Sequence, residues 1–343
     1  TPFQAFVRTQ TGCDKFCAFC VVPRVRGPEQ ARPPHAIIAE AEKLVGEGCR
    51  EITLIGQTVN SYRWSDGGKT FRLSDLLVGL DAIDGLDRIK FVTSYPRDMT
   101  TDLIEAVRDL PHVSHYIHVP AQHGSDAVLK RMKRGYTIGQ YMEMLGRLRE
   151  AIPHVAVSSD FIVGFCGETD AEFALSLELT KTVKFKNSFI FKYSPRPGTK
   201  AFDRQADDVP ESVKKERNRL LQEAQAVASL EGNQRFVGSR QQVLVEGLST
   251  RDERHAVDPG PDGLAQLTGR TMCDRIVVFD APLRLIGRMV DVDIISAGAW
   301  SLAGDVADDL ANAVPLDHLE QSGPAVHQIR VPAQSPPQIA QRS

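Results

Sequence analysis

Three cysteines near the start of the chain, Cys13, Cys17 and Cys20, have a spacing that suits iron–sulfur chemistry, in a C-x3-C-x2-C run. Cysteine thiolates are the usual ligands of iron–sulfur clusters, so three neighbouring thiolates can hold three irons of a [4Fe–4S] cluster. Because no fourth cysteine lies nearby, the fourth iron would stay open to a small molecule. The sequence therefore predicts one [4Fe–4S] cluster with these three cysteines as its metal ligands.

Two other uses of these cysteines are less favourable. Structural zinc takes four protein ligands, commonly as two separated pairs, and the remaining cysteines stand singly at Cys49, Cys166 and Cys273. A disulfide framework suits a short secreted chain, whereas this one has 343 residues. Free cysteines instead fit a reducing compartment, so we expect a cytoplasmic protein.

Strands and helices alternate as far as about residue 231, which predicts an α/β fold with a parallel sheet. Between the strands, helical apolar spacing predicts helices such as Ser74–Ile83, with Ser74 as its N-cap, and 56–70 reads as a polar loop. Residues at the carboxyl ends of such strands form active sites in barrels of this kind. The six predicted strands are Phe3–Val7, Glu51–Ile55, Arg88–Thr93, His115–Val119, Val155–Val163 and Lys186–Tyr193.

The pattern changes after residue 231. A charged helix, Val209–Leu230, precedes short strands separated by turn residues over Asn233–Ala297, and such strands predict a small antiparallel barrel. From about Gly304 the sequence is rich in Pro, Gln, Ser and Ala without periodicity, which predicts a disordered tail. The predicted domains are therefore 1–231, 233–297 and a tail over 304–343.

The composition is that of an ordinary globular protein, with 42% hydrophobic and 25% charged residues. No run of about 18 apolar residues exists, so no membrane association is expected, and we expect a monomer. The net charge of −3 excludes a global attraction to nucleic acid. Any RNA surface must be a local basic patch. The helix residues Lys214, Lys215, Arg217 and Arg219 could form one, although a solvated helix face is the simpler interpretation.

Several motifs together resemble the radical SAM methylthiotransferase family. Phe19 precedes the last cysteine of the run, as in radical S-adenosylmethionine (SAM) enzymes. The resemblance extends over about residues 3–297, and its Arg-Gly-Tyr-Thr and Tyr-Ser-Pro-Arg-Pro-Gly-Thr forms are most similar to the branch that makes 2-methylthio-N6-dimethylallyladenosine in tRNA. The matching segments are Val21–Gly27, Leu54–Asn60, Pro120–Asp126, Met132–Thr137, Asp160–Thr169, Tyr193–Thr199 and Gly269–Thr271.

This resemblance implies a fold and an activity. The fold is an open (β/α)6 partial TIM barrel followed by a TRAM-like RNA-binding barrel. The activity is methylthiolation of C2 of N6-dimethylallyladenosine at position 37 of tRNA, with SAM cleaved to a 5′-deoxyadenosyl radical. The implied partners are tRNA and an electron donor such as flavodoxin or ferredoxin.

Two departures from the family are visible. Family members carry a second [4Fe–4S] cluster on three cysteines of a preceding domain, and the six cysteines of this chain cannot supply that set. We therefore expect a fragment or a truncated homologue that lacks the sulfur-donating half. The second departure is Cys166, where the family usually has proline, and we expect a small buried side chain there.

Candidate site residues follow from side-chain chemistry at the predicted strand ends. Phe19 would face the adenine of SAM. Uncharged hydrogen-bonding groups and one carboxylate suit the ribose and methionyl groups of SAM, with loop capping as the alternative for each: Gln57, Asn60, Ser94, Gln122 and Asp160. Guanidinium groups bind a substrate carboxylate or phosphate and aromatic rings stack on a base, which makes Arg134, Arg196, Tyr136 and Tyr193 candidates for substrate binding, with ion pairing or core packing as alternatives.

Three rival functions stay open at this level. Within the family, the substrate could be threonylcarbamoyladenosine in tRNA or an aspartate of a ribosomal protein. If the chain is not an enzyme, it could be a non-catalytic RNA-binding remnant, although such a remnant would have no need of the three cysteines.

Overall fold

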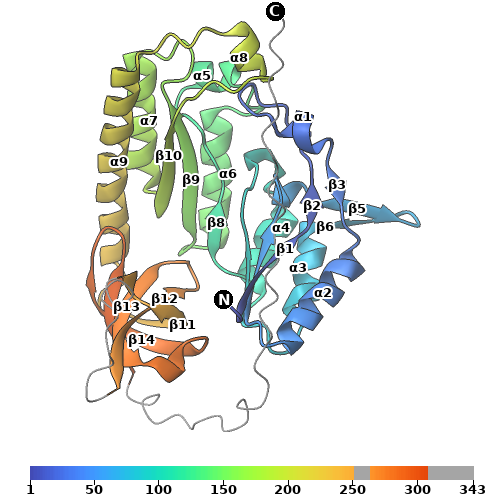
Figure 1. Cartoon of the computed structure of the whole chain (residues 1–343), viewed down its shortest axis with the longest axis vertical. Coiled ribbons are helices and arrows are strands. Elements are labelled where there is room, and N and C mark those ends of the chain that lie inside the picture. Colours follow the sequence, from blue (N-terminus) through green and yellow to red (C-terminus); the bar gives the residue numbers. More distant parts are fainter. Residues whose placement is uncertain (251–262, 308–343) are drawn as a thin grey trace, which may run out of the picture. The chain divides into compact units, whose positions relative to one another are not determined.

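The computed structural model of the chain describes residues 1–250 and 263–307 (Figure 1). Its first part is an open sheet of six parallel strands, which confirms the predicted α/β partial barrel. Three strands pair in the order β1-β4-β7 and three in the order β10-β9-β8. The two halves meet where the Ser94 N–H donates to the carbonyl of His118 at 3.0 Å. The strands are β1 (Gln4–Arg8), β4 (Glu51–Ile55), β7 (Arg88–Phe91), β8 (Tyr116–His118), β9 (Ala156–Val163) and β10 (Asn187–Lys192).

Helices cover one face of this sheet (Figure 1). Alternate strand residues such as Ile52, Leu54 and Phe91 are buried in the core that these helices share with the sheet, as the period of two in a strand requires. The helices are α2 (Pro34–Gly46), α3 (Leu73–Asp81), α4 (Thr101–Asp109), α5 (Asp126–Arg131), α6 (Ile138–Ala151) and α7 (Asp170–Val183), with short α1 (Val22–Arg26), α8 (Lys200–Arg204), η1 (Val59–Ser61) and η2 (Pro96–Asp98) in the connections.

Capping residues define where the longer helices begin. Thr137 accepts from the Gln140 N–H while the Gln140 side chain accepts from the Thr137 N–H, and such a capping box satisfies two otherwise unpaired donors. The predicted N-cap of α3 is wrong, because α3 starts one residue earlier and Ser74 donates instead to Asp102 at 2.6 Å.

The predicted loop 56–70 contains a hairpin that the sequence analysis missed. Strands β5 (Arg63–Asp66) and β6 (Lys69–Arg72) pair antiparallel. Gly67 and Gly68 form the two-residue turn with φ of 55° and 83°, the left-handed conformation that such tight turns need. The strands are mostly exposed and polar, so the hydrophobic alternation that normally marks a strand is weak here.

Helix α9 (Glu211–Gln234) leads from the sheet to a closed barrel. The interpretation of its basic residues as a solvated face is wrong for two of them. Lys214 and Arg217 are 3% and 5% exposed, because Lys214 pairs with Asp207 at 2.5 Å and Arg217 pairs with Glu168 at 3.1 Å. Arg217 thereby fixes α9 against the loop that follows β9, and Lys214 fixes it to the segment between α8 and α9.

Short strands form the expected barrel, and one of its strands, β15, lies beyond the range predicted for it. Its order is β11-β12-β13-β15-β14. The pair β13–β15 is parallel, so the barrel is not purely antiparallel. The strands are β11 (Arg240–Leu248), β12 (Leu264–Thr271), β13 (Ile276–Pro282), β14 (Met289–Ala297) and β15 (Leu302–Val306), with η3 (Leu283–Leu285) before β14.

Strand β15 lies where the tail was predicted to begin. Leu302 is 1% exposed, and a Cβ on Gly304 would lie 2.5 Å from the carbonyl oxygen of Asp293. Glycine there allows β15 to approach β14 closely, so this residue serves the barrel rather than a disordered tail. The rest of the predicted tail, 308–343, lies outside the described residues, and the predicted boundary at 231–233 stays a prediction.

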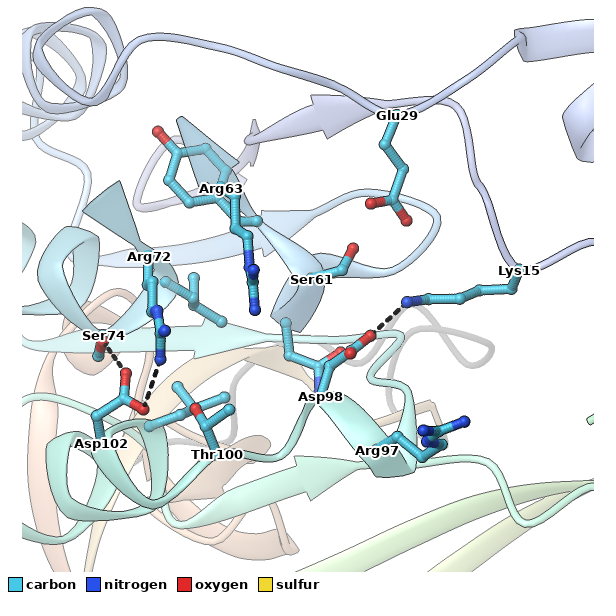
Figure 2. A pocket seen from close by; sticks show the side chains of 14 residues that line it. Lys15, Glu29, Ser61, Arg63, Arg72, Ser74, Arg97, Asp98, Thr100 and Asp102 are labelled. Carbon is cyan, nitrogen blue, oxygen red and sulfur yellow. Dashed lines mark hydrogen bonds and ion pairs between the residues drawn. The ribbon is translucent and has the colours of Figure 1, made fainter. Parts of the chain in front are cut away.

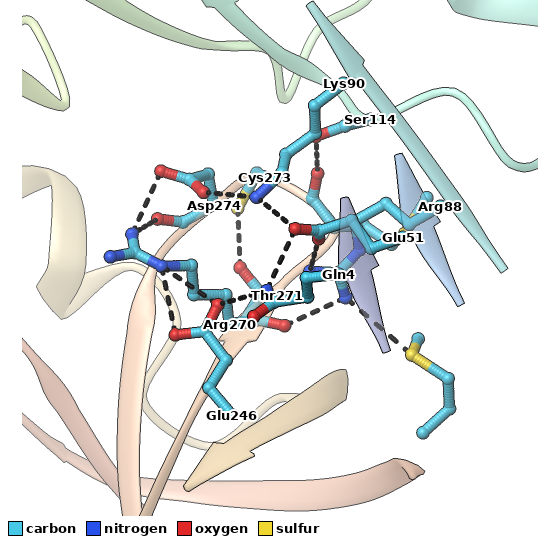
Figure 3. A network of polar contacts seen from close by, with 12 residues as sticks. Gln4, Glu51, Arg88, Lys90, Ser114, Glu246, Arg270, Thr271, Cys273 and Asp274 are labelled. Atoms are coloured by element: carbon cyan, nitrogen blue, oxygen red, sulfur yellow. Dashed lines mark hydrogen bonds and ion pairs between the residues drawn. The ribbon is translucent and has the colours of Figure 1, made fainter. Parts of the chain in front are cut away.

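A buried network of charges joins the barrel to the sheet (Figure 3). Arg88, which is 0% exposed, pairs with Glu51 at 3.3 Å and donates to the carbonyl of Arg270 at 2.9 Å. Asp274 of the barrel accepts from Lys90, Lys186 and Arg270 at 3.3, 2.8 and 3.2 Å. The barrel therefore covers the amino ends of the strands with matched buried charges.

Candidate iron–sulfur centre

The cysteine run forms a loop after β1, and its two ends are held together. Short strands β2 (Gln10–Thr11) and β3 (Gln30–Ala31) pair across the base of the loop, and the Cys13 N–H donates to the carbonyl of Gly27 at 3.1 Å. A Cβ on Gly12 would lie 1.9 Å from the Pro28 carbonyl oxygen, and its φ is 79°. Only glycine fits at that position.

The three thiols gather at this loop. All are free; Cys13 is buried, and Cys17 and Cys20 are partly exposed. Burial raises the pKa of Cys20, and the neighbouring Cys17 and Cys13 raise it further. In the described part of the chain, no three His, Cys, Asp or Glu side chains converge on a single metal ion. In a [4Fe–4S] cluster each thiolate binds a different iron, and the C-x3-C-x2-C spacing of these three cysteines suits that chemistry.

Arg134 lies against this loop. Its Nη1 donates to Cys17 Sγ at 3.2 Å, and its Nε donates to Tyr136 Oη at 3.1 Å. Burial opposes the positive charge, but Tyr136 and Cys17 outweigh it and raise the pKa of Arg134. The predicted role of Arg134 as a free ligand for a substrate anion is therefore not supported, because its guanidinium is already used by a candidate cluster ligand.

Phe19 anchors the other side of the loop. Its ring meets Phe165 edge-on with centroids 6.2 Å apart, and both lie in a small apolar cluster that contains Cys166. Cys166 is 4% exposed, which confirms its expected role as a small buried side chain. The side chain of Phe19 therefore packs on protein, and a contact of this residue with adenine would fall to its backbone.

Three of the predicted SAM ligands have a polar atom without a partner in the structure. Gln57 Oε1, Ser94 Oγ and Gln122 Oε1 are buried with no hydrogen bond. Buried polar atoms are nearly always paired, so these unpaired atoms support a polar ligand. Gln57, Ser94 and Gln122 follow the adjacent strands β4, β7 and β8 at their carboxyl ends. Gln122 also has a φ of 68°, a backbone strain that often accompanies functional sites.

Asn60 and Asp160 are used differently. The Asn60 side chain accepts from the Tyr95 N–H at 2.7 Å and donates to the Tyr95 carbonyl at 2.9 Å, so loop capping is its observed role and the predicted SAM contact is not supported. Asp160 Oδ1 lies 3.0 Å from His118 Nε2. Because His118 Nδ1 accepts from the Thr93 N–H at 3.2 Å, Nε2 carries the proton and donates to Asp160.

His118 is a candidate site residue that the sequence analysis missed. It closes β8 on the same face as Asp160, and Phe189 of β10 contacts its ring edge-on at 6.1 Å. The available signal was a polar residue at the end of a buried strand, two positions before the Pro120–Asp126 motif.

The two tyrosines predicted to stack on a base are in the core. Tyr136 is 4% exposed and donates to the carbonyl of Ala121 at 2.9 Å, and burial raises its pKa to about 12. Tyr193 is 5% exposed and packs on Phe165 at 4.9 Å. Neither ring is free for a base, so this prediction is wrong and the core-packing alternative holds. Arg196 is exposed, and its positive charge partly opposes the burial that raises the pKa of Cys20.

A polar cavity of about 230 Å³ adjoins the cysteine loop (Figure 2). Lys15, which lies between the cluster cysteines, pairs across it with Asp98 at 2.5 Å, and Arg72 pairs with Asp102 at 3.5 Å. The first contact holds the cysteine loop against the segment that follows β7, and the second joins that segment to the one that follows β4.

The other two cysteines lie far from this loop in the fold. Cys49 donates to the Glu51 carbonyl at 3.2 Å before β4, and Cys273 lies in the barrel beside Thr271. Together with Cys166 they occupy three separate regions. Of the six cysteines of this chain, three therefore form a candidate cluster site: Cys13, Cys17 and Cys20.

Comparison with known proteins agrees with this site. The model of the radical SAM superfamily matches residues 7–180, and that of the TRAM domain matches residues 234–307. A relative from Rhodopirellula baltica, named tRNA-2-methylthio-N(6)-dimethylallyladenosine synthase, is 55% identical over 306 residues, which are 89% of this chain and 63% of that protein. One of the same name from Saccharophagus degradans is 43% identical, over 88% of this chain and 64% of that protein.

The chain thus spans less than two thirds of the length of these relatives. Among solved structures, coproporphyrinogen III oxidase from Escherichia coli, described as a radical SAM enzyme, has a similar fold, with a TM-score of 0.50 and 20% identity over 69% of this chain and 55% of that one. In the described part of the chain, no helix has the length and apolarity to cross a bilayer. The domain match, the partial barrel and the cysteine loop together show that the chain belongs to the radical SAM superfamily, whose members bind a [4Fe–4S] cluster and SAM.

Proposed function

We propose that this chain is the radical-generating and RNA-binding part of an enzyme that methylthiolates C2 of N6-dimethylallyladenosine at position 37 of tRNA. The observation that carries this proposal is the Cys13–Cys20 loop, placed at the carboxyl edge of a partial barrel beside unpaired polar atoms of Gln57, Ser94 and Gln122. The identity of 55% to a tRNA methylthiotransferase over 89% of the chain supports the substrate.

Each group at the site has a distinct task in this proposal. Cys13, Cys17 and Cys20 hold three irons of the cluster. Arg134 fixes Cys17 and balances its negative charge, since its guanidinium donates directly to the sulfur. When bound, the cluster and SAM supply the radical that removes a hydrogen atom from the substrate, and the protein contributes binding and orientation.

Gln57, Ser94 and Gln122 orient SAM by hydrogen bonds to its polar groups. His118 and Asp160 form a fixed pair, in which the Asp160 carboxylate can accept hydrogen bonds from ribose hydroxyls. The TRAM barrel holds tRNA. We further propose that the protein acts as a monomer in the cytoplasm, with flavodoxin or ferredoxin as the electron donor.

Anaerobic reconstitution tests this function. The chain should bind about four irons, as one cubane cluster requires, and with dithionite it should cleave SAM to 5′-deoxyadenosine. Cys17→Ala should lose both properties, whereas Cys273→Ala, which alters a cysteine of the barrel, should keep them. Stable zinc in place of iron, or equal iron content in both variants, would contradict the proposal.

A further inference from the structure

A groove of about 750 Å³ lies between the sheet and the barrel, at the end of the strands opposite the cysteine loop. Three helices end at this groove: α6 at Ala151, α7 at Val183 and α9 at Gln234. We call it the basic groove and define it by five lining residues: His115, Arg149, His154, Arg235 and Arg275. Among the described residues that line it, none is a carboxylate.

The guanidinium groups of the basic groove are fixed by neutral partners. Arg149 donates to the carbonyl of Val183, and Arg275 donates to the side-chain carbonyl of Asn233. Arg275 also stacks on Phe236 at 4.5 Å, and its Nε is buried without an acceptor. These arginines are therefore held in position while their charge is not balanced by a carboxylate. Glu231 pairs with Lys184 at 2.8 Å, and the charges of Lys184 and, to a smaller extent, Arg235 lower the pKa of Glu231.

The partial negative charges at the carboxyl ends of the three helices do not neutralise all of the positive charge of the basic groove. Each helix carboxyl end carries roughly half a negative charge, so the three ends together offset about half of the three guanidinium charges. A surplus of positive charge remains. The pKa shifts of the buried arginines agree with this surplus of positive charge. Burial lowers the pKa of Arg149 and of Arg275, and the charge of Arg235 lowers both further. Burial and the neighbouring His154 lower the pKa of His115.

We propose that the basic groove binds the phosphate backbone of the tRNA. This inference rests on the proposed function for the identity of the RNA and adds the place where its backbone is held. A volume of about 750 Å³ exceeds that of a single phosphate and lies in the range of pockets for larger ligands. The lining comes from both parts of the chain: His115, Arg149 and His154 belong to the radical SAM part, and Arg275 belongs to the barrel. The backbone is therefore held by both parts of the chain at once, far from the base that reacts.

Arg235→Gln is the main test, because Arg235 is exposed and its loss leaves the fold intact. We expect the affinity of the holoenzyme for tRNA to fall about fivefold to tenfold, and the slope of log affinity against log salt to become shallower by about one. The loss should be equal for tRNA with and without the dimethylallyl group, since phosphate contacts carry no base information. Arg235→Lys should restore both quantities.

Arg219→Gln is the matched control on the same helix, because Arg219 is exposed but already paired with Glu216 and Glu223 at 2.6 and 2.5 Å. It should bind tRNA as the wild type does. Formation of 5′-deoxyadenosine without RNA should be unchanged in Arg235→Gln, because the groove lies at the opposite strand ends from the cysteine loop.

Unchanged tRNA affinity and salt slope in both Arg235→Gln and Arg275→Gln would overturn the proposal. Free pyrophosphate serves as a second probe: if Arg235→Gln lost pyrophosphate binding but kept its full affinity for tRNA, the proposal would also be overturned, because the groove would then bind small anions only. Since tRNA binding is measured without turnover, a failure of the chain to cleave SAM to 5′-deoxyadenosine would contradict the proposed function and leave this test intact.

Discussion

Asp274→Asn should destabilise the protein strongly, because this carboxylate is the centre of the charge network between barrel and sheet (Figure 3). Asp274 is 8% exposed and accepts from three cations, Lys90, Lys186 and Arg270. Burial opposes its ionisation, but these cations outweigh burial and lower its pKa from 3.8 to about 2.

That difference in pKa corresponds to about 2.5 kcal/mol of folding free energy at neutral pH, since one pKa unit corresponds to about 1.4 kcal/mol. Removing one partner of a buried ion pair costs about 3–5 kcal/mol. Asparagine keeps one oxygen as an acceptor, so we expect the free energy of unfolding to fall by about 2–3 kcal/mol. Anaerobic urea denaturation followed by far-UV circular dichroism measures this change.

The pH dependence has a definite sign. The folded pKa of Asp274 lies below its unfolded value, so its contribution is complete above the unfolded pKa and is lost as the pH falls from about 4 to about 2. The stability difference between wild type and Asp274→Asn should therefore be constant at pH 5–7 and shrink below about pH 4.

Asp293→Asn is the matched control in the same barrel. Asp293 also forms an ion pair, with Arg240 at 2.9 Å, but both side chains are about half exposed, and exposed pairs stabilise little. It should unfold at the wild-type urea concentration. If Asp274→Asn were no less stable than Asp293→Asn, the network would contribute nothing to docking of the barrel and the reasoning would fail.

Three other outcomes test the site. Gln122→Ala should weaken SAM binding about tenfold, as loss of one hydrogen bond of about 1–1.5 kcal/mol predicts. Asn60→Ala should instead lower thermal stability and leave SAM affinity unchanged. Calorimetry with the reconstituted protein measures both quantities, and a loss of SAM affinity in Asn60→Ala but not in Gln122→Ala would contradict this assignment. Arg134→Gln should destabilise the cluster on exposure to air, because Cys17 loses its charged donor; absorbance decay no faster than in the wild type would refute that role. The chain alone should cleave SAM but should not methylthiolate dimethylallyl-modified tRNA, because Cys49, Cys166 and Cys273 lie in separate regions and cannot hold a second cluster; multiple turnovers of methylthio product by mass spectrometry would disprove this.

Patterns among residues close in sequence were sufficient to predict much of the fold and the three cysteine ligands of the cluster. The three cysteines are close in sequence, so their spacing alone predicts a shared cluster. Strand β4 occupies the residues predicted for it, because hydrophobic periodicity is a property of consecutive residues. The hairpin over Arg63–Arg72 escaped that reasoning because its polar strands have little alternation.

The tertiary structure alone decided which polar residues are free to act. Asn60 and Gln122 are chemically similar and both follow a predicted strand, yet Asn60 is used by the backbone of Tyr95 while Gln122 keeps a buried oxygen without a partner. Similarly, Tyr136 is in the core and Arg134 holds Cys17, which is 117 residues away in sequence. A side chain's role depends on the partners that folding brings to it from distant segments, and those partners leave no local pattern in the sequence.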